Sequence, residues 1–308
     1  MLPPPLRRCM RLTTRDYLLA TVAYADVFDY PLTEDDAYFW FIHTTPTKNF
    51  RSLSSKGILH YHHFLYLKGR KHILATYEDR HRTSKGKWQI ARMVGSWLRF
   101  VPTIQLVGVT GGLALNNTNR NDDIDFFFIT SKRTIWISRL LATLMVELTG
   151  KRRKPKDTNV TDKICLNMFM SEDALRLPSS EQDLFAAHEV LQMVPLWARG
   201  NSYWDFLRAN VWVKTFLPVA WSIKKSARIN HPKSTYWWTR IAVIFLRLCE
   251  WPVQIVQLWY MSHHRTGEVI SEGVLRFHPR DARGWIRDKF MNRLAKYNMP
   301  IDKIFYGR

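Results

Sequence analysis

Residues 107–130 read VGVTGGLALNNTNRNDDIDFFFIT, and this stretch decides the fold. An apolar strand runs into Gly111 and Gly112, and a polar loop follows. Asp123 and Asp125 then open a second apolar strand. Because side chains at positions i and i+2 of a strand point to the same face, the two carboxylates are expected side by side. Such a pair repels itself unless a cation lies between, which predicts a site for Mg²⁺ or Mn²⁺.

The two glycines suit the same site. Without a Cβ atom, Gly111 and Gly112 allow the backbone to approach a phosphate closely and to offer it N–H groups. An Asp-Ile-Asp sequence at a strand start can by itself be a turn or cap device. With a Gly-Gly pair upstream, we favour a metal site at Asp123 and Asp125.

The order of strand, Gly-Gly, polar loop, Asp-Ile-Asp and strand resembles the nucleotidyltransferase superfamily of DNA polymerase beta, over residues 107–170. The resemblance implies that Gly111 and Gly112 hold a triphosphate and that Asp123 and Asp125 bind the divalent metals. It also implies a reaction: transfer of a nucleoside monophosphate from a nucleoside triphosphate to a hydroxyl acceptor, with release of pyrophosphate.

The third carboxylate of that family is expected on a later strand, KICLNMFM, residues 163–170. The polar position there is Asn167, which cannot act as a base. Asp162 precedes the strand and would substitute if the register shifted. The alternative reading is a catalytically inactive module of the same fold that binds nucleotide and nucleic acid as a regulator.

The sequence before the central stretch predicts a winged-helix-like module over residues 1–78. Helical spacing covers residues 14–25, 34–42 and 48–58, and an alternating β-ribbon follows over 59–70. A basic face suited to nucleic-acid phosphates would contain Arg51, Lys56, Lys68, Arg70 and Lys71. The same scaffold also occurs as a packing module only.

The rest of the chain predicts two further regions, and the fold class is α+β. A nucleotidyltransferase domain over residues 79–175 would contain a mixed sheet with flanking helices. Its expected elements are an amphipathic connector at 80–100 with Ile90, Met93, Val94 and Trp97 on one face, strands at 103–110, 123–130 and 163–170, and a helix at 134–149. Residues 176–308 are expected to form an all-α domain.

The composition favours polyanionic partners. Among 308 residues there are 46 Lys and Arg against 26 Asp and Glu, which gives a formal charge of +20. Nucleotides, nucleic acid and an anionic membrane surface suit this balance, although a basic protein need not bind any of them. Cys9, Cys165 and Cys249 have no paired spacing, and the N-terminus has no apolar signal core, so we expect a cytoplasmic protein.

Residues 237–261 are rich in Ile, Leu, Val and Trp, but Arg240, Arg247, Glu250 and Pro252 interrupt them. Charges near the centre of a membrane span are costly, so we expect a buried or amphipathic helix and no integral membrane insertion. Peripheral attachment to a membrane is a weaker alternative.

Three smaller patterns are ambiguous. His60, His62 and His63 could suggest zinc but fit an exposed wing better. His188 with Glu189, and His278 before Pro279, are polar pairs that a cap or a buried hydrogen bond would explain. The basic run over residues 151–156 could steer phosphates or be a solvated turn.

Overall fold

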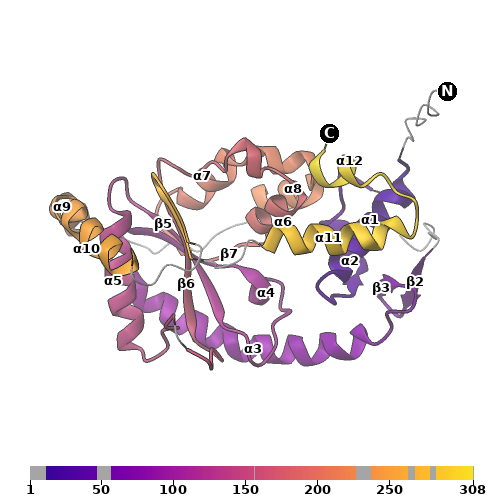
Figure 1. Ribbon diagram of the computed structural model, residues 1–308, viewed down its shortest axis with the longest axis horizontal. Coiled ribbons are helices and arrows are strands. Elements are labelled where there is room, and N and C mark those ends of the chain that lie inside the picture. Colours follow the sequence, from indigo (N-terminus) through magenta and orange to yellow (C-terminus); the bar gives the residue numbers. More distant parts are fainter. Residues whose placement is uncertain are drawn as a thin grey trace.

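The computed structural model describes residues 12–46, 57–155, 157–226, 237–262, 268–277 and 282–307. It is a mixed α+β fold around an open six-stranded sheet of order β7-β4-β5-β6-β9-β8, accompanied by a three-stranded sheet of order β1-β3-β2 (Figure 1). The large sheet is mixed because β5 and β6 pair in parallel while its other pairs are antiparallel. Its strands are β4 (Ile104–Val109), β5 (Ile124–Thr130), β6 (Ile164–Ser171), β7 (Val194–Ala198), β8 (Val269–Ser271) and β9 (Val274–Arg276).

The helices surround this sheet and continue to the N-terminal region. They are α1 (Thr14–Asp26), α2 (Glu34–Phe39), α3 (Ile73–Trp97), α4 (Gly111–Ala114), α5 (Ile135–Leu148), α6 (Leu184–Gln192), α7 (Ser202–Ala209), α8 (Pro218–Ser226), α9 (Trp237–Leu248), α10 (Glu250–Ser262), α11 (Ala282–Ala295) and α12 (Ile301–Tyr306). The expected strands at 103–110, 123–130 and 163–170 and the helix at 134–149 are confirmed.

Strand β5 separates two apolar cores. Ile124, Phe126 and Phe128 pack on one face with residues of α3 and α5. Phe127 and Ile129 pack on the other face with residues of α1, α6, α7 and α11. A strand that is buried on both faces needs a nearly continuous apolar sequence, and Ile-Asp-Phe-Phe-Phe-Ile supplies it with one polar exception.

The predicted apolar face of the connector, residues 80–100, is wrong in part. Helix α3 buries Lys87, Ala91, Val94 and the following Leu98, whereas Met93 and Trp97 are exposed. The buried stripe follows the i, i+4, i+7 spacing of a helix, but it contains a lysine and a small alanine. A search for large apolar side chains therefore places the stripe on the wrong side of the helix.

The expectation of an all-α region after residue 176 is wrong, because β7, β8 and β9 belong to the large sheet. Strand β7 pairs with β4 at one side, and β9 pairs with β6 at the other. Strands β8 and β9 have three residues each, too few for an alternating pattern to be recognised. Pro195 lies in β7, at the sheet edge where a missing N–H is tolerated.

The N-terminal region contains two of the expected helices and the expected β-ribbon. Thr13 and Thr33 each form a capping box, with Asp16 at the start of α1 and Asp36 at the start of α2. Strands β1 (Leu32–Thr33), β2 (Ile58–Tyr61) and β3 (Phe64–Leu67) form the small sheet. The helix expected at 48–58 falls outside the described residues up to position 56, and Ile58 already begins β2. The boundaries 1–78, 79–175 and 176–308 stay predictions.

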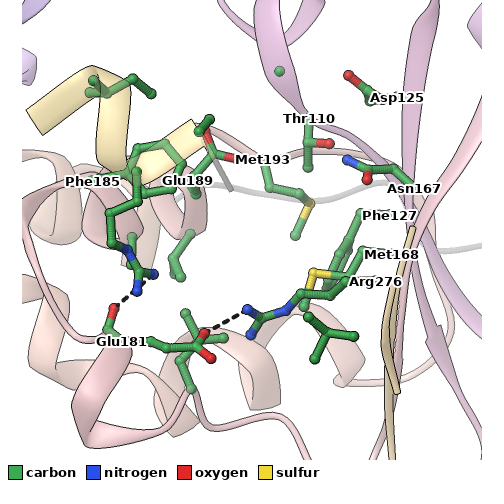
Figure 2. Close-up of a pocket in the computed structure, with 18 of the residues that line it drawn as sticks. Thr110, Asp125, Phe127, Asn167, Met168, Glu181, Phe185, Glu189, Met193 and Arg276 are labelled. Atoms are coloured by element: carbon green, nitrogen blue, oxygen red, sulfur yellow. Dashed lines mark hydrogen bonds and ion pairs between the residues drawn. The ribbon is translucent and has the colours of Figure 1, made fainter. Parts of the chain in front are cut away.

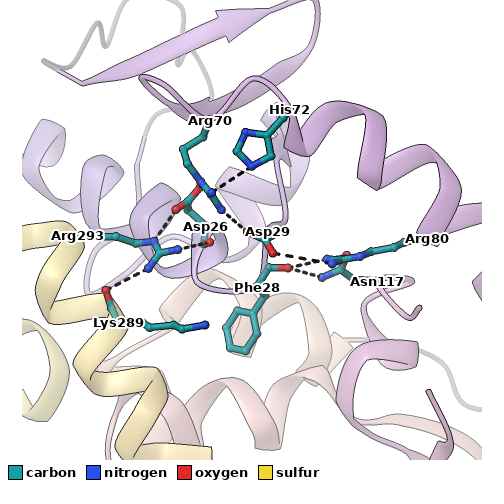
Figure 3. A network of polar contacts seen from close by, with 9 residues as sticks. All are labelled: Asp26, Phe28, Asp29, Arg70, His72, Arg80, Asn117, Lys289 and Arg293. Atoms are coloured by element: carbon teal, nitrogen blue, oxygen red, sulfur yellow. Dashed lines mark hydrogen bonds and ion pairs between the residues drawn. The ribbon is translucent and has the colours of Figure 1, made fainter. Parts of the chain in front are cut away.

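Buried ion pairs connect the N-terminal region to α11 (Figure 3). Asp26, at the end of α1, accepts hydrogen bonds from Arg70 at 2.8 Å and from Arg293 at 2.5 Å. The Asp26 side chain is buried, and Arg70 also pairs with the more exposed Asp29. Three segments distant in sequence therefore meet at one carboxylate.

Within the described residues, no single helix is long and apolar enough to cross a membrane. The segments Ile241–Leu248 and Glu250–Ser262 satisfy the length and composition test only as a pair, which is bent by 53°.

Candidate functional site

The site begins where β4 ends and α4 starts. Gly111 has φ +66°, in the left-handed region that favours glycine. A Cβ atom on Gly111 would lie 2.8 Å from Oδ2 of Asp125, and one on Gly112 would lie 3.0 Å from the carbonyl oxygen of Asn117. The two glycines therefore let the turn pack directly against the Asp125 carboxylate and against the loop that follows.

Asp123 and Asp125 lie together on one face of β5, as their spacing predicts. Ligand atoms of Asp123, Asp125 and Cys165 all lie within 4.8 Å of one another. Cys165 is there because β5 and β6 are parallel and Asp125 is directly opposite Cys165. The strand position next to the carboxylate pair thus holds a thiol.

Asn167, expected at the third-carboxylate position, occupies an irregularity of β6. The register shifts between the pairs Phe126 with Leu166 and Phe127 with Met168, so Asn167 has no partner residue on β5. Its side chain lines the cavity near Thr110 and Asp125 (Figure 2).

The alternative candidate, Asp162, is engaged elsewhere. Its carboxylate accepts a hydrogen bond at 2.8 Å from the buried amine of Lys87. Lys87 also donates to the backbone carbonyls of Arg120 and Asp122. The Asp122 carboxylate accepts from the backbone N–H of Asn119. These contacts hold the loop before β5 and keep both side chains out of the Asp123 and Asp125 pair.

The two carboxylates of the pair have different surroundings. Burial, and secondly the charge of Asp123, raise the pKa of Asp125 to about 7. Asp123 instead forms an ion pair with Arg153 at 2.5 Å, from the basic run after α5. Burial, and then Asp125, also raise the pKa of the Cys165 thiol, which keeps it protonated. Arg153 therefore pairs directly with Asp123 and acts on Asp125 only through the weaker effect of its charge.

Two polar atoms at this site have no hydrogen-bond partner within the part of the chain that the structure describes. They are Oδ1 of Asp125 and Oγ1 of Thr110, and both are buried. A buried polar atom without a partner is costly, and it is explained when a ligand supplies the partner. Mg²⁺ binds through one or two carboxylates and keeps water or phosphate oxygens as its other ligands. Asp123 and Asp125 fit such an ion, while the Cys165 thiol does not suit it.

A cavity of about 430 Å³ opens from this point (Figure 2). Thr110, Asp125 and Asn167 form a polar corner. The rest is mostly apolar, with Phe127, Met168, Met170, Leu177, Phe185, Val190, Met193, Phe206, Trp285 and Ile286 among its lining residues. Arg276 of β9, on the same sheet and beside Met168, reaches across to pair with Glu181 at 2.6 Å (Figure 2). The cavity thus combines an acidic corner, an apolar body and an arginine that extends from the sheet.

Glu189 of α6 is a site residue whose position the sequence did not reveal. It lines the same cavity, and burial raises its pKa to about 7. Its carboxylate accepts a hydrogen bond at 2.8 Å from Gln192. The sequence marked the His188–Glu189 pair, but the packing of α6 over the sheet decides which of the two faces the cavity.

The other histidine patterns have structural explanations. His188 stacks on Tyr24, with ring centroids 3.9 Å apart, and on Trp40. Burial lowers its pKa to about 4. His60, His62 and His63 are exposed on the β-ribbon, and His278 lies outside the described residues. Over the described part of the chain, Asp123, Asp125 and Cys165 are the one group of three potential ligand residues whose ligand atoms lie close enough to share a metal ion.

Of the five residues expected to form a basic face on the N-terminal region, only Lys68 and Lys71 are both described and unengaged by a carboxylate. Arg51 and Lys56 lie outside the described residues, and Arg70 is held by Asp26 and Asp29. Lys68 and Lys71 are exposed. Nucleic-acid binding by this region stays a prediction.

Comparison with protein-family models, with curated proteins and with solved structures finds no match to this chain. The functional argument therefore depends on the geometry of the site and the chemistry of its residues.

Proposed function

We propose that the chain is a divalent-metal-dependent nucleotidyltransferase, which moves a nucleoside monophosphate from a nucleoside triphosphate to a hydroxyl acceptor and releases pyrophosphate. The observation that carries the proposal is the buried Asp125 carboxylate. One of its oxygens has no partner among the described residues, and the other lies against the left-handed Gly111 at the mouth of a large cavity.

The residues of the proposed site have different roles in this reaction. Asp123 and Asp125 would hold Mg²⁺ or Mn²⁺, which when bound supplies neutralisation of triphosphate charge. Gly111 and Gly112 leave room for phosphate oxygens beside the backbone. Arg153 neutralises Asp123 and, on release from it, becomes a cationic contact for phosphate.

The acceptor hydroxyl needs a group that receives its proton. Glu189 is a carboxylate that lines the cavity, and a pKa of about 7 suits a general base. In the proposed reaction Glu189 takes the hydroxyl proton, the oxygen bonds to the α-phosphorus, and the bond to pyrophosphate breaks. Positioning and charge neutralisation supply most of the rate in phosphoryl chemistry.

The second candidate function is a catalytically inactive module that binds nucleotide, and nucleic acid, as a regulator. Cys165 favours it, because a protonated thiol lies beside Asp125 on the strand that would carry the third carboxylate.

The deciding experiment measures pyrophosphate release from each of the four ribonucleoside triphosphates with Mg²⁺ or Mn²⁺, with bulk RNA or protein as acceptors. We expect release by the wild type and by the exposed-site control Asp79→Asn, and none by Asp123→Asn/Asp125→Asn. Glu189→Gln should retain nucleotide binding and lose release. Binding without release by the wild type, with release gained by Cys165→Asp, would establish the inactive module instead.

A further inference from the structure

Helices α9 and α10 expose many large apolar side chains to solvent. In α9, Thr239 is the one buried residue among the described side chains, whereas Ile244, Phe245 and Leu248 are exposed. A helix on the surface of a globular protein turns its apolar stripe toward the core. Helix α9 turns that stripe toward the solvent.

Helix α10 is apolar on both sides, because Met261 is buried and Val253 and Leu258 pack against the core. Its buried Gln257 donates a hydrogen bond to the carbonyl of Trp136 and accepts one from Arg139 of α5. On the outer side, Trp251 is 71% exposed and Trp259 is 68% exposed. Polar and apolar groups on the inner side therefore attach the helix to the protein, while the rings of Trp251 and Trp259 stay exposed.

The exposed side chains form one apolar surface, which we call the α9–α10 face. Its members are Ile241, Ile244, Phe245, Leu248, Trp251, Ile255, Val256, Trp259 and Tyr260. The two helices lie at the end of the molecule opposite α12, on the outer side of α5 (Figure 1). Contiguous apolar surface of this kind is uncommon on a monomer unless it is an interaction site.

Two exposed cations of the described residues, Arg247 and Lys132, lie at the edge of the face. Glu250, the only acidic residue of α9 and α10, accepts hydrogen bonds from the backbone N–H groups of Trp136 and Ile137 at the start of α5. Arg247 is exposed and donates to the carbonyl of Lys132, whose own side chain is exposed.

We propose that the α9–α10 face lies in the surface of an anionic lipid bilayer. Apolar side chains would enter the upper acyl region, Trp and Tyr would lie at the headgroup level, and Arg247 and Lys132 would contact acidic headgroups. The proposed attachment is to one leaflet, which suits a helix pair that is bent by 53° and in which neither helix is long and apolar enough to cross a membrane alone.

A second copy of the chain would not suit the face as well. Each copy carries the same surplus of positive charge, +20 over the whole chain, so two faces would meet with like charges at their rims. An anionic membrane combines an apolar interior with the opposite charge, which matches both properties of the face.

The test is flotation of the full chain with phosphatidylcholine vesicles, with and without phosphatidylglycerol, at low and high salt. The variant Phe245→Ser/Trp259→Ser removes two outward rings. Its matched control, Leu59→Ser/Tyr61→Ser, removes two exposed apolar residues from β2. We expect the wild type and the control to float with anionic vesicles at low salt, and the partition coefficient of the helix variant to fall about tenfold or more.

Three outcomes would overturn the proposal. In the first, the wild type remains in the fraction that does not float at low salt. In the second, the helix variant floats as well as the wild type. In the third, light scattering shows a stable wild-type dimer that the helix variant lacks, and vesicles bind neither protein. Pyrophosphate release, measured on the same variants, is expected to be unchanged. Failure of membrane binding is thereby distinguished from failure of the nucleotidyltransferase proposal.

Discussion

At the scale of single residues, two glycines with nearly the same backbone conformation have different surroundings. Gly111 has φ +66° and Gly150 has φ +67°. An added Cβ on Gly150 would meet nothing within 4 Å, whereas on Gly111 it would meet the Asp125 carboxylate. Comparing the two separates backbone strain from disturbance of the site.

We expect Gly111→Ala and Gly150→Ala to lower the free energy of unfolding by a similar amount, about 1 kcal/mol, because both place alanine in the left-handed region. Only Gly111→Ala should weaken Mn²⁺ binding and pyrophosphate release, since it displaces Asp125. Urea denaturation and metal titration measure the two effects. Equal loss of metal binding in both variants would contradict this role of Gly111.

Glu189 and its neighbour His188 have pKa shifts with opposite consequences for stability. The pKa of Glu189 rises from its usual 4.5 to about 7, so the folded state binds a proton more readily than the unfolded state. That contribution to stability is complete below pH 4.5 and is lost as the pH rises through 7. Burial lowers the pKa of His188 from 6.5 to about 4. The contribution of its neutral ring to the stability of the fold is complete above pH 6.5 and is lost as the pH falls through 4.

Glu189→Gln should therefore unfold at higher urea concentrations than the wild type at pH 8 and similarly at pH 4.5, with a difference at high pH of up to about 3 kcal/mol. His188→Gln should show the opposite trend, gaining on the wild type only as the pH falls from 6.5 toward 4. Urea midpoints over this pH range provide the measurement. A Glu189→Gln difference that does not change with pH would show that Glu189 titrates normally.

At the scale of elements, the sequence predicts those strands and helices that local apolar patterns and turn residues specify. Strand β5 follows from its nearly continuous apolar run, and the shared face of Asp123 and Asp125 follows from their spacing of two residues. Cys165 was missed because its place beside Asp125 depends on the register between two strands, which a β-bulge then shifts before Asn167. Strand β7 was missed because its five residues depend for their conformation on pairing with β4.

Lys87 of helix α3 is predicted to stabilise the fold. This buried amine holds Asp162 and two backbone carbonyls of the loop before β5. Lys87→Met should lower the free energy of unfolding by about 1–3 kcal/mol, because it leaves two backbone carbonyls without their donor, whereas the partly exposed Asp162 can be hydrated. The control is Lys85→Met at an exposed position of the same helix, for which we expect less than about 1 kcal/mol. Thermal denaturation of both variants compares them, and similar melting temperatures would contradict the role given to Lys87.

At the scale of the whole molecule, Asp26 connects α1, the segment after β3 and α11 (Figure 3). One apolar core accordingly includes residues from Leu18 to Phe305. The N-terminal and C-terminal regions are thus expected to unfold together.

Asp26→Asn should lower the free energy of unfolding by about 3 kcal/mol, since it leaves two arginines without their buried carboxylate. Asp29→Asn is the matched control, because Asp29 also pairs with Arg70 but its side chain is 45% exposed; we expect less than about 1 kcal/mol there. Hydrogen exchange of α1 and α11 should increase together in the first variant. An increase confined to one of the two helices would argue against a shared unfolding unit.

The position of β9 in the sheet has a consequence for how the protein is made. Strand β6 has an open edge until β9 emerges from the ribosome, roughly 100 residues later. At translation rates of about 5–20 residues per second, that edge is exposed for about 5–20 s. Neighbouring nascent chains on one polysome can pair through such edges. Slow codons between residues 172 and 273 should therefore reduce the folded yield, whereas slow codons before residue 104 should leave it unchanged.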